Sequence, residues 1–255
     1  MIINKLKNSK YYKFRLFIES TINKSIGLLL FQYQKRDNLF NWFYNVLEYQ
    51  NIRIPELSPK RNYYEFGVGS GGSIKIYILA LKKFCRNYKQ DINNYHIFAF
   101  DSFEGLPEQS IEDNHINWKK GWMKWNENSV LEVIDETKFP KNNFHIIKGF
   151  YEKTLTDNNK DILFNFPPSI INIDCDYYSS TITVFKWINY YLKSGTIFRF
   201  DDIWAFHGNP HYGELKAINK LNSWGLGYLK EFPILGLDSY VYIYSKKEFE
   251  FKQNY

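Results

Sequence analysis

Residues 63–73 read Tyr-Tyr-Glu-Phe-Gly-Val-Gly-Ser-Gly-Gly-Ser, and they carry the clearest structural signal in the chain. Apolar, β-prone residues lead into a cluster of glycines, and a helical pattern of apolar positions begins at Ser73. Because glycine has no Cβ, such a cluster lets the backbone turn sharply and come close to a ligand. The helix N-terminus behind it offers free N–H groups to an anionic part of that ligand. The stretch therefore predicts a strand, a ligand-binding turn and the start of a helix.

The rest of the chain alternates between strand-like and helix-like segments, as βαβ units do. Further strands are expected at residues 96–102, 144–149, 169–174, 196–201, 229–235 and 239–245, and helices at residues 73–88, 129–137, 181–192 and 214–221. This order predicts an α/β fold with a doubly wound, mainly parallel sheet. The last two strands have no helix between them, so we expect them to pair antiparallel. Residues 108–128 are polar and rich in Trp, and we expect an irregular lid there rather than a packed element.

The positive charge of the chain lies entirely in its first part. Residues 1–60 contain ten Lys and Arg against four Asp and Glu, whereas the remainder is balanced, although the whole chain carries a formal charge of +6. Apolar spacing predicts helices at 11–34 and 38–50, so we expect a basic helical extension at 1–60 and a catalytic domain at 61–255. The extension is either a solvated helical segment or a contact with a membrane surface, a partner or an anionic substrate.

The composition also bears on compartment and partners. Two cysteines far apart in sequence, Cys85 and Cys175, favour a reducing compartment over a disulfide framework. The first apolar stretch is broken by Lys and Asn, and the run at 26–31 is too short to cross a bilayer, so we expect a cytoplasmic protein without a signal peptide. A nucleic-acid enzyme would carry its basic residues in the cleft, so no nucleic-acid partner is expected.

Five aspartates follow strands and are expected along one edge of the sheet, where ligands of such folds bind. Asp101 ends the second strand, the position at which an acid holds ribose hydroxyls in dinucleotide folds. It follows Gly72 by 29 residues, and the glycines lack the dinucleotide spacing, which favours a cofactor with one ribose and no pyrophosphate. The alternative is that Asp101 only caps the following turn.

The pairs Asp174/Asp176 and Asp201/Asp202 form the second group of acids. Carboxylates gathered at strand ends repel one another unless a cation neutralises them, and all-oxygen ligands suit Mg²⁺, Ca²⁺ or Mn²⁺. For Asp176 the alternative of a solvated loop acid stays open. Three histidines in the lid and in the loop after the fifth strand are candidates for a general base, with a solvated loop histidine as the alternative for each: His115, His207 and His211.

Five segments together resemble a known family. They are Glu65-x-Gly67-x-Gly69-x-Gly71-x-Ser73, Phe100-Asp-Ser-Phe-Glu-Gly-Leu-Pro107, Gly149-Phe-Tyr-Glu-Lys-Thr-Leu155, Asp174-x-Asp176-x-Tyr178-x-Ser180-Thr181 and Asp201-Asp202. In this order they resemble class I S-adenosylmethionine-dependent methyltransferases of the macrocin O-methyltransferase type, over residues 62–220. The resemblance implies a Rossmann-like, seven-stranded sheet. It also implies S-adenosylmethionine on the glycine turn, Asp101 on the ribose, and a lid histidine as base.

The resemblance assigns roles to individual positions. Cofactor-binding residues are expected at Glu65, Gly67, Gly69, Gly71, Ser73, Asp101, Ser102 and Gly149. Ligands of a Mg²⁺ ion are expected at Asp174, Asp201 and Asp202, with Asp174 and His115 as the catalytic residues. These roles describe metal-assisted O-methylation of a sugar, nucleotide-sugar, glycoside or related small molecule.

Two other functions and one question of assembly stay open at this point. Asp174-Cys175-Asp176 is also the D-x-D pattern of metal-dependent glycosyltransferases. The chain is alternatively a non-catalytic binding module tethered by its basic N-terminus. Self-association is left open.

Overall fold

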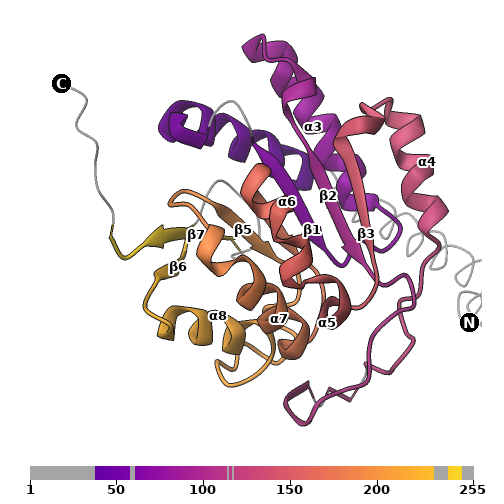
Figure 1. Cartoon of the computed structure of the whole chain (residues 1–255), viewed down its shortest axis with the longest axis vertical. Coiled ribbons are helices and arrows are strands. Elements are labelled where there is room, and N and C mark those ends of the chain that lie inside the picture. Colours follow the sequence, from indigo (N-terminus) through magenta and orange to yellow (C-terminus); the bar gives the residue numbers. More distant parts are fainter. Residues whose placement is uncertain (1–37, 58–60, 114, 117, 233–240, 249–255) are drawn as a thin grey trace, which may run out of the picture.

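The computed structural model describes residues 38–57, 61–113, 115–116, 118–232 and 241–248. Its centre is a seven-stranded sheet of order β3-β2-β1-β4-β5-β7-β6 (Figure 1). The strands are β1 (Asn62–Phe66), β2 (Ile97–Asp101), β3 (Phe144–Lys148), β4 (Pro168–Ile173), β5 (Ile197–Phe200), β6 (Gly227–Glu231) and β7 (Val241–Lys246). The first five run parallel, and β7 pairs antiparallel with both β5 and β6. The predicted doubly wound sheet and its antiparallel final pair are confirmed.

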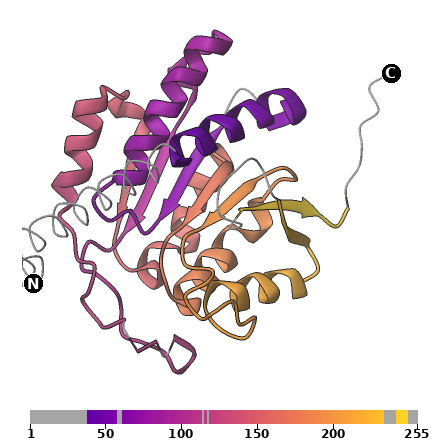
Figure 2. The ribbon, with the colours of Figure 1, turned by 180° about the vertical axis from the view of Figure 1, so that it is seen from behind.

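Helices cover both faces of the sheet because its central strands are apolar on both sides. Tyr63 lies in one core with the helix at residues 38–53, α3 (Gly72–Tyr88) and α4 (Glu127–Thr137). Its neighbour Tyr64 lies in a second core with α6 (Lys160–Asn165), α7 (Tyr178–Ile188) and α8 (Gly213–Ser223). Figure 2 shows these two layers from behind, with the helix at 38–53 and α3 on the same side of the sheet. No described helix is both long and apolar enough to cross a membrane.

The strand order fixes where a ligand can bind. From β1 the chain moves outward through β2 to β3, and it then returns to β4 on the other side of β1. The carboxyl ends of β1 and β4 therefore border the crevice at which the winding direction reverses, which is the ligand site of open α/β sheets.

Several predicted boundaries need correction. The helix α7 begins at Tyr178 rather than at residue 181 and ends at Ile188 rather than at residue 192. The helix α4 begins two residues before the predicted residue 129, directly after its N-cap residue Asn126. β6 ends at Glu231, short of the predicted residue 235. Two short helices, α5 (Tyr151–Thr154) and α6, were not predicted. The helix at 38–50 is confirmed and continues to residue 53, whereas the predicted helix at 11–34 lies outside the described residues.

Candidate active site

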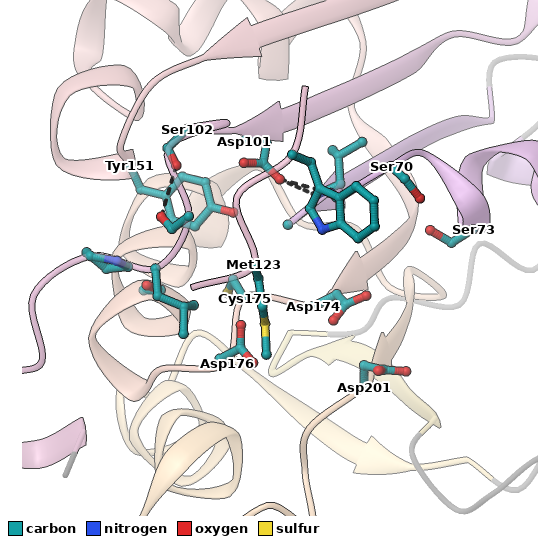
Figure 3. Close-up of a pocket in the computed structure, with 18 of the residues that line it drawn as sticks. Ser70, Ser73, Asp101, Ser102, Met123, Tyr151, Asp174, Cys175, Asp176 and Asp201 are labelled. Atoms are coloured by element: carbon teal, nitrogen blue, oxygen red, sulfur yellow. Dashed lines mark hydrogen bonds between the residues drawn. The ribbon is translucent and has the colours of Figure 1, made fainter. Parts of the chain in front are cut away.

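A cavity of about 460 Å³ lies at the carboxyl ends of β1, β2 and β4 (Figure 3). Its lining includes the glycine turn after β1, the end of β2 and the loop behind it, the lid residues Met123 and Trp125, residues 149–152, the acids that follow β4 and β5, and Leu39 of the helix at 38–53. Asp101, Ser102, Asp174 and Asp201 of the predicted site all belong to this lining. The structure therefore brings the predicted cofactor turn and two of the three predicted metal ligands, Asp174 and Asp201, to one cavity, whereas Asp202 does not line it.

The glycine turn is in direct contact with the end of β4. Gly67 has a φ of +86°, and a Cβ built on it would lie 1.7 Å from the backbone oxygen of Asp174, so no other residue fits. Gly69 also has positive φ and lies under the indole of Trp125, 3.4 Å from the position of a Cβ. Gly71 is buried and faces Val130, so it packs α3 against α4 instead of lining the cavity. Ser73, in the first turn of α3, does line the cavity.

Asp101 holds the glycine turn in place. Its Oδ2 accepts hydrogen bonds from the backbone N–H groups of Val68 (2.7 Å) and Gly69 (3.0 Å), and its Oδ1 accepts one from Phe103 (2.7 Å). Asp101 also lines the cavity, and because these bonds use three of the four acceptor positions of its carboxylate, one position on Oδ1 is left for a ligand. Ser102 closes the next turn by donating to the Gly105 carbonyl and accepting from the N–H of Glu104. Turn capping and ligand contact are thus compatible roles for Asp101.

Gly149 belongs to the same rim. Its N–H donates to the backbone oxygen of Asp101 (2.9 Å), and its φ is +138°. A Cβ there would lie 2.8 Å from Thr154. The glycine lets residues 149–152 bend over the cavity and bring Tyr151 into its wall, a contribution that the sequence did not indicate.

Glu65 lies beneath the turn and outside the cavity lining. Its side chain is fully buried and accepts hydrogen bonds from Tyr63 Oη (2.5 Å) and from Ser73 Oγ, so it ties β1 to the start of α3. Burial raises the pKa of Glu65 to about 7, although the two hydroxyl donors and Arg199 act in the opposite direction. The structure gives Glu65 a supporting position under the turn, and direct contact with a cofactor stays a prediction.

Asp174, Asp201 and Asp202 converge as predicted, with one carboxylate oxygen of each within 4.8 Å of the others. Burial and the neighbouring Asp201 raise the pKa of Asp174 well above its usual value. Crowded carboxylates of this kind are stabilised by a cation, and three oxygen donors from the ends of two strands suit Mg²⁺ or Mn²⁺. The donor set therefore fits a hard divalent ion.

One cation of the protein already lies beside this cluster. Arg199 of β5 is largely buried, and its guanidinium donates to Asn172 Oδ1 (2.8 Å) and to Asp201 Oδ1. Glu214, in the first turn of α8, approaches from the other side and accepts from the backbone N–H of Asp202 (3.1 Å). Neither residue was predicted as part of the site.

Asp176 is buried and lines the cavity, so the alternative of a solvated loop acid is wrong. It has a φ of +61°, a strained conformation for a residue other than glycine, and such strain is concentrated at functional sites. Burial and the neighbouring Asp202 raise the pKa of Asp176 to about 8. In Figure 3 its carboxylate lies beneath Met123, on the same side of the cavity as Asp174.

His115 does not line the cavity. Its ring stacks on Trp118 at 4.1 Å between centroids and meets Phe206 edge-on. The lid around it was expected to be unpacked, and this is partly wrong, because Trp118 and Asp113 are buried. Asp113 accepts from the N–H of Ser179 (3.1 Å), which ties the lid to α7. Two lid residues that do reach the cavity, Met123 and Trp125, were missed.

A family model described as Macrocin-O-methyltransferase (TylF) matches residues 60–222, more than half of the chain. The crystal structure of CalS11, a calicheamicin methyltransferase, is similar with a TM-score of 0.63 at 22% identity, covering 96% of this chain and 90% of that chain. The apo structure of CalS11, there described as a TDP-rhamnose 3'-O-methyltransferase, is similar with a TM-score of 0.56 at 21% identity. It covers 95% of this chain and 90% of that chain. The structure of the O-methyltransferase NovP is similar with a TM-score of 0.54 at 14% identity, and it covers 82% of this chain and 79% of that chain. At these identities the likeness to solved structures shows a shared fold. No curated protein matches the chain in sequence.

Proposed function

Since the chain belongs to the macrocin O-methyltransferase family and is an S-adenosylmethionine-dependent O-methyltransferase, we propose that it methylates a sugar hydroxyl with the help of a divalent ion. The observation that carries the proposal is the contact between Gly67 and Asp174, which sets the cofactor turn against the acid cluster in one cavity. The glycosyltransferase alternative loses its basis, since the same family match includes the glycine turn and the Asp174-Cys175-Asp176 segment.

The residues of the turn suit S-adenosylmethionine. Gly67 and Gly69 expose backbone to the cavity, and the start of α3 directs its free N–H groups there, which suits the carboxylate of the amino acid part. Asp101 would accept a hydrogen bond from a ribose hydroxyl at the one acceptor position, on Oδ1, that the backbone leaves open. Trp125, above Gly69, would cover the cofactor from the lid side.

Methyl transfer is an in-line displacement in which the methyl group leaves sulfur and bonds to the acceptor oxygen, whose proton must be removed. The protein contributes chiefly by aligning the three reacting atoms, and such positioning lowers a barrier by several kcal/mol. Asp174, Asp201 and Asp202 would hold the Mg²⁺ ion. When bound, the ion lowers the pKa of the acceptor hydroxyl and fixes its direction.

Asp176 is placed to take the proton. Its carboxylate lines the cavity beside Asp174, whereas His115 stacks on Trp118 outside the lining. Geometry is the first requirement of a general base, so we assign this role to Asp176 in preference to His115.

A sugar acceptor agrees with two observations. CalS11 is described as a TDP-rhamnose 3'-O-methyltransferase, and this chain shares its fold over most of its length. Met123 and Trp125 lie on the cavity wall with about half of each residue exposed, and the aromatic surface of Trp125 is of the kind that packs against the apolar faces of sugar rings. Free glycosides and nucleotide-sugars both remain within the proposal.

The proposal also includes residues 1–60 as a basic helical extension to the domain at 61–255.

The proposal is tested by pairing cofactor binding with methyl transfer. Calorimetry should show binding of S-adenosylmethionine and its demethylated product, S-adenosylhomocysteine, but not of NAD. Methyl transfer from labelled cofactor to a panel of glycosides and nucleotide-sugars should stop with EDTA and return with Mg²⁺. Full activity of EDTA-treated protein on a genuine acceptor would disprove the metal-assisted mechanism, and an active panel confined to acceptors other than sugars would disprove the sugar assignment.

A further inference from the structure

Arg199 is a charged residue inside an apolar strand. It lies on β5 between Phe198 and Phe200, which are both fully buried, and its own side chain is 11% exposed. A buried guanidinium is costly unless its donors are satisfied, and it keeps its proton under all ordinary conditions. A long apolar side chain would fill the same space at lower cost, so the charge itself calls for an explanation.

Both terminal nitrogens of the Arg199 guanidinium donate hydrogen bonds to residues of the site. Nη1 donates to Asn172 on the neighbouring strand β4 (2.8 Å), and Nη2 donates to Oδ1 of Asp201. Its positive charge also acts on Asp174, whose pKa it lowers against the effects of burial and of Asp201. Arg199 therefore occupies one oxygen of a carboxylate that belongs to the candidate metal cluster, and it lines the same cavity.

This arrangement has two consequences for a divalent ion in the cluster. The hydrogen bond from Arg199 to Oδ1 restrains the orientation of the Asp201 carboxylate. The other oxygen, Oδ2, is not bonded to the guanidinium. The guanidinium charge, one hydrogen bond away from a ligand, repels a second cation in the cluster. The restraint on Asp201 favours the correct geometry of the ion's ligands, and the repulsion lowers the affinity of the cluster for the ion.

We propose that Arg199 is a positioning residue that orients Asp201 and weakens divalent-ion binding, so that the ion exchanges readily instead of staying permanently bound. The inference rests on the proposed metal-assisted function. It goes beyond that function because it assigns the affinity of the site to a residue that is not a ligand.

The test compares ion affinity in three variants of the full chain. Arg199→Gln removes the charge but keeps hydrogen-bond donors, and Arg199→Lys keeps the charge but loses the fork. Lys141→Gln removes a positive charge at an exposed ion pair with Asp135 and is the matched control. Mg²⁺ and Mn²⁺ titrations are made by calorimetry on protein saturated with S-adenosylhomocysteine, after circular dichroism confirms folding.

We expect Arg199→Gln to bind both ions about tenfold more tightly or better, because a repulsive charge next to the cluster is removed. Lys141→Gln should stay within about threefold of the unmodified protein, whereas Arg199→Lys should bind both ions about threefold or more less tightly, because it keeps the charge but loses the fork that orients Asp201. A folded Arg199→Gln variant with unchanged or weaker ion affinity would overturn the inference. If the Arg199→Gln variant does not fold, the Arg199→Lys variant decides. About tenfold tighter ion binding by Arg199→Lys, despite its retained charge, would also overturn the inference.

The experiment also separates this inference from the proposed function. If the unmodified protein binds no ion at millimolar concentration but Arg199→Gln does, then Arg199 takes the place of the ion, which supports the inference and contradicts metal-assisted catalysis. If neither binds an ion, both are wrong, whereas binding of S-adenosylhomocysteine in the same cell still reports on the methyltransferase assignment.

Discussion

Replacing Glu65 by Gln should make the protein more stable at neutral and alkaline pH and change little at acidic pH. Glu65 is fully buried, and its pKa is raised from about 4.5 to about 7. Gln has the same shape as the protonated acid and can keep hydrogen bonds to Tyr63 and Ser73 through the hydroxyl groups. The substitution therefore removes the titration and keeps the packing.

The sign and size of the effect follow from the two pKa values. Between pH 4.5 and 7 the folded protein keeps a proton on Glu65 that the unfolded chain has lost, so the free energy of unfolding falls as pH rises through this window. The full loss is about 3 kcal/mol, the free-energy equivalent of a pKa difference of roughly 2.5 units. Above pH 7 the contribution of Glu65 is constant.

The assay is urea unfolding followed by circular dichroism at a series of pH values from 4.5 to 8.5, without metal or cofactor. The free energy of unfolding of the Gln variant minus that of the unmodified protein should increase by about 3 kcal/mol across the series. The other acids of the site titrate in both proteins, so most of their contribution cancels in the difference; the exception is Asp174, whose pKa the charge of Glu65 helps to raise. Glu136→Gln, at an exposed ion pair with Lys75, is the control and should give a difference that changes little with pH. A difference for Glu65→Gln that is equally flat would refute the buried-acid interpretation.

Four further outcomes test the site. Gly67→Ala should lower the free energy of unfolding by about 3 kcal/mol in urea titrations, because its methyl group meets the Asp174 carbonyl; wild-type stability would refute the close contact. Trp125→Ala should weaken S-adenosylhomocysteine binding about tenfold in calorimetry, and unchanged affinity would remove it from the cofactor wall. Asp202→Asn should reduce turnover at least about tenfold while cofactor affinity stays the same, so a loss of both would argue for a structural role. Asp176→Asn should abolish turnover in the methyl-transfer assay whereas His115→Gln retains it, and the opposite result would restore the histidine as base.

The strands and the cofactor turn were predictable because their signals are local. Apolar runs flanked by Gly, Pro and Asn located six of the seven strands, and the seventh was implied by the same pattern around Glu65. The convergence of Asp174 with Asp201 followed from a general property of parallel sheets, whose carboxyl ends meet at one edge. Boundaries such as the start of α7 were wrong because tertiary packing of Tyr178 extends the helix beyond its apolar spacing.

The parts of the site that were missed depend on contacts between segments distant in sequence. Asp176 looked like a loop acid because its burial comes from the chain that packs over it. Trp125 reaches the cavity only because the lid folds back over Gly69. For Arg199 a signal was present, since a charge in the run Ile197–Phe200 is unusual for a central strand, but the sequence alone did not indicate which group it would meet.

The lid offers a place to change acceptor choice without disturbing the cofactor. Its base is fixed by backbone hydrogen bonds between Leu106 and both Gly121 and Trp122, and its far part is tied to α7 through Asp113. Exposed residues between these anchors, such as Ile111 and Ile116, contribute no buried side chain to the core. Substitutions confined to that interval would change the outer surface of the lid and leave the cofactor-binding scaffold unaltered, whereas a change of acceptor would also need Met123, which reaches the cavity.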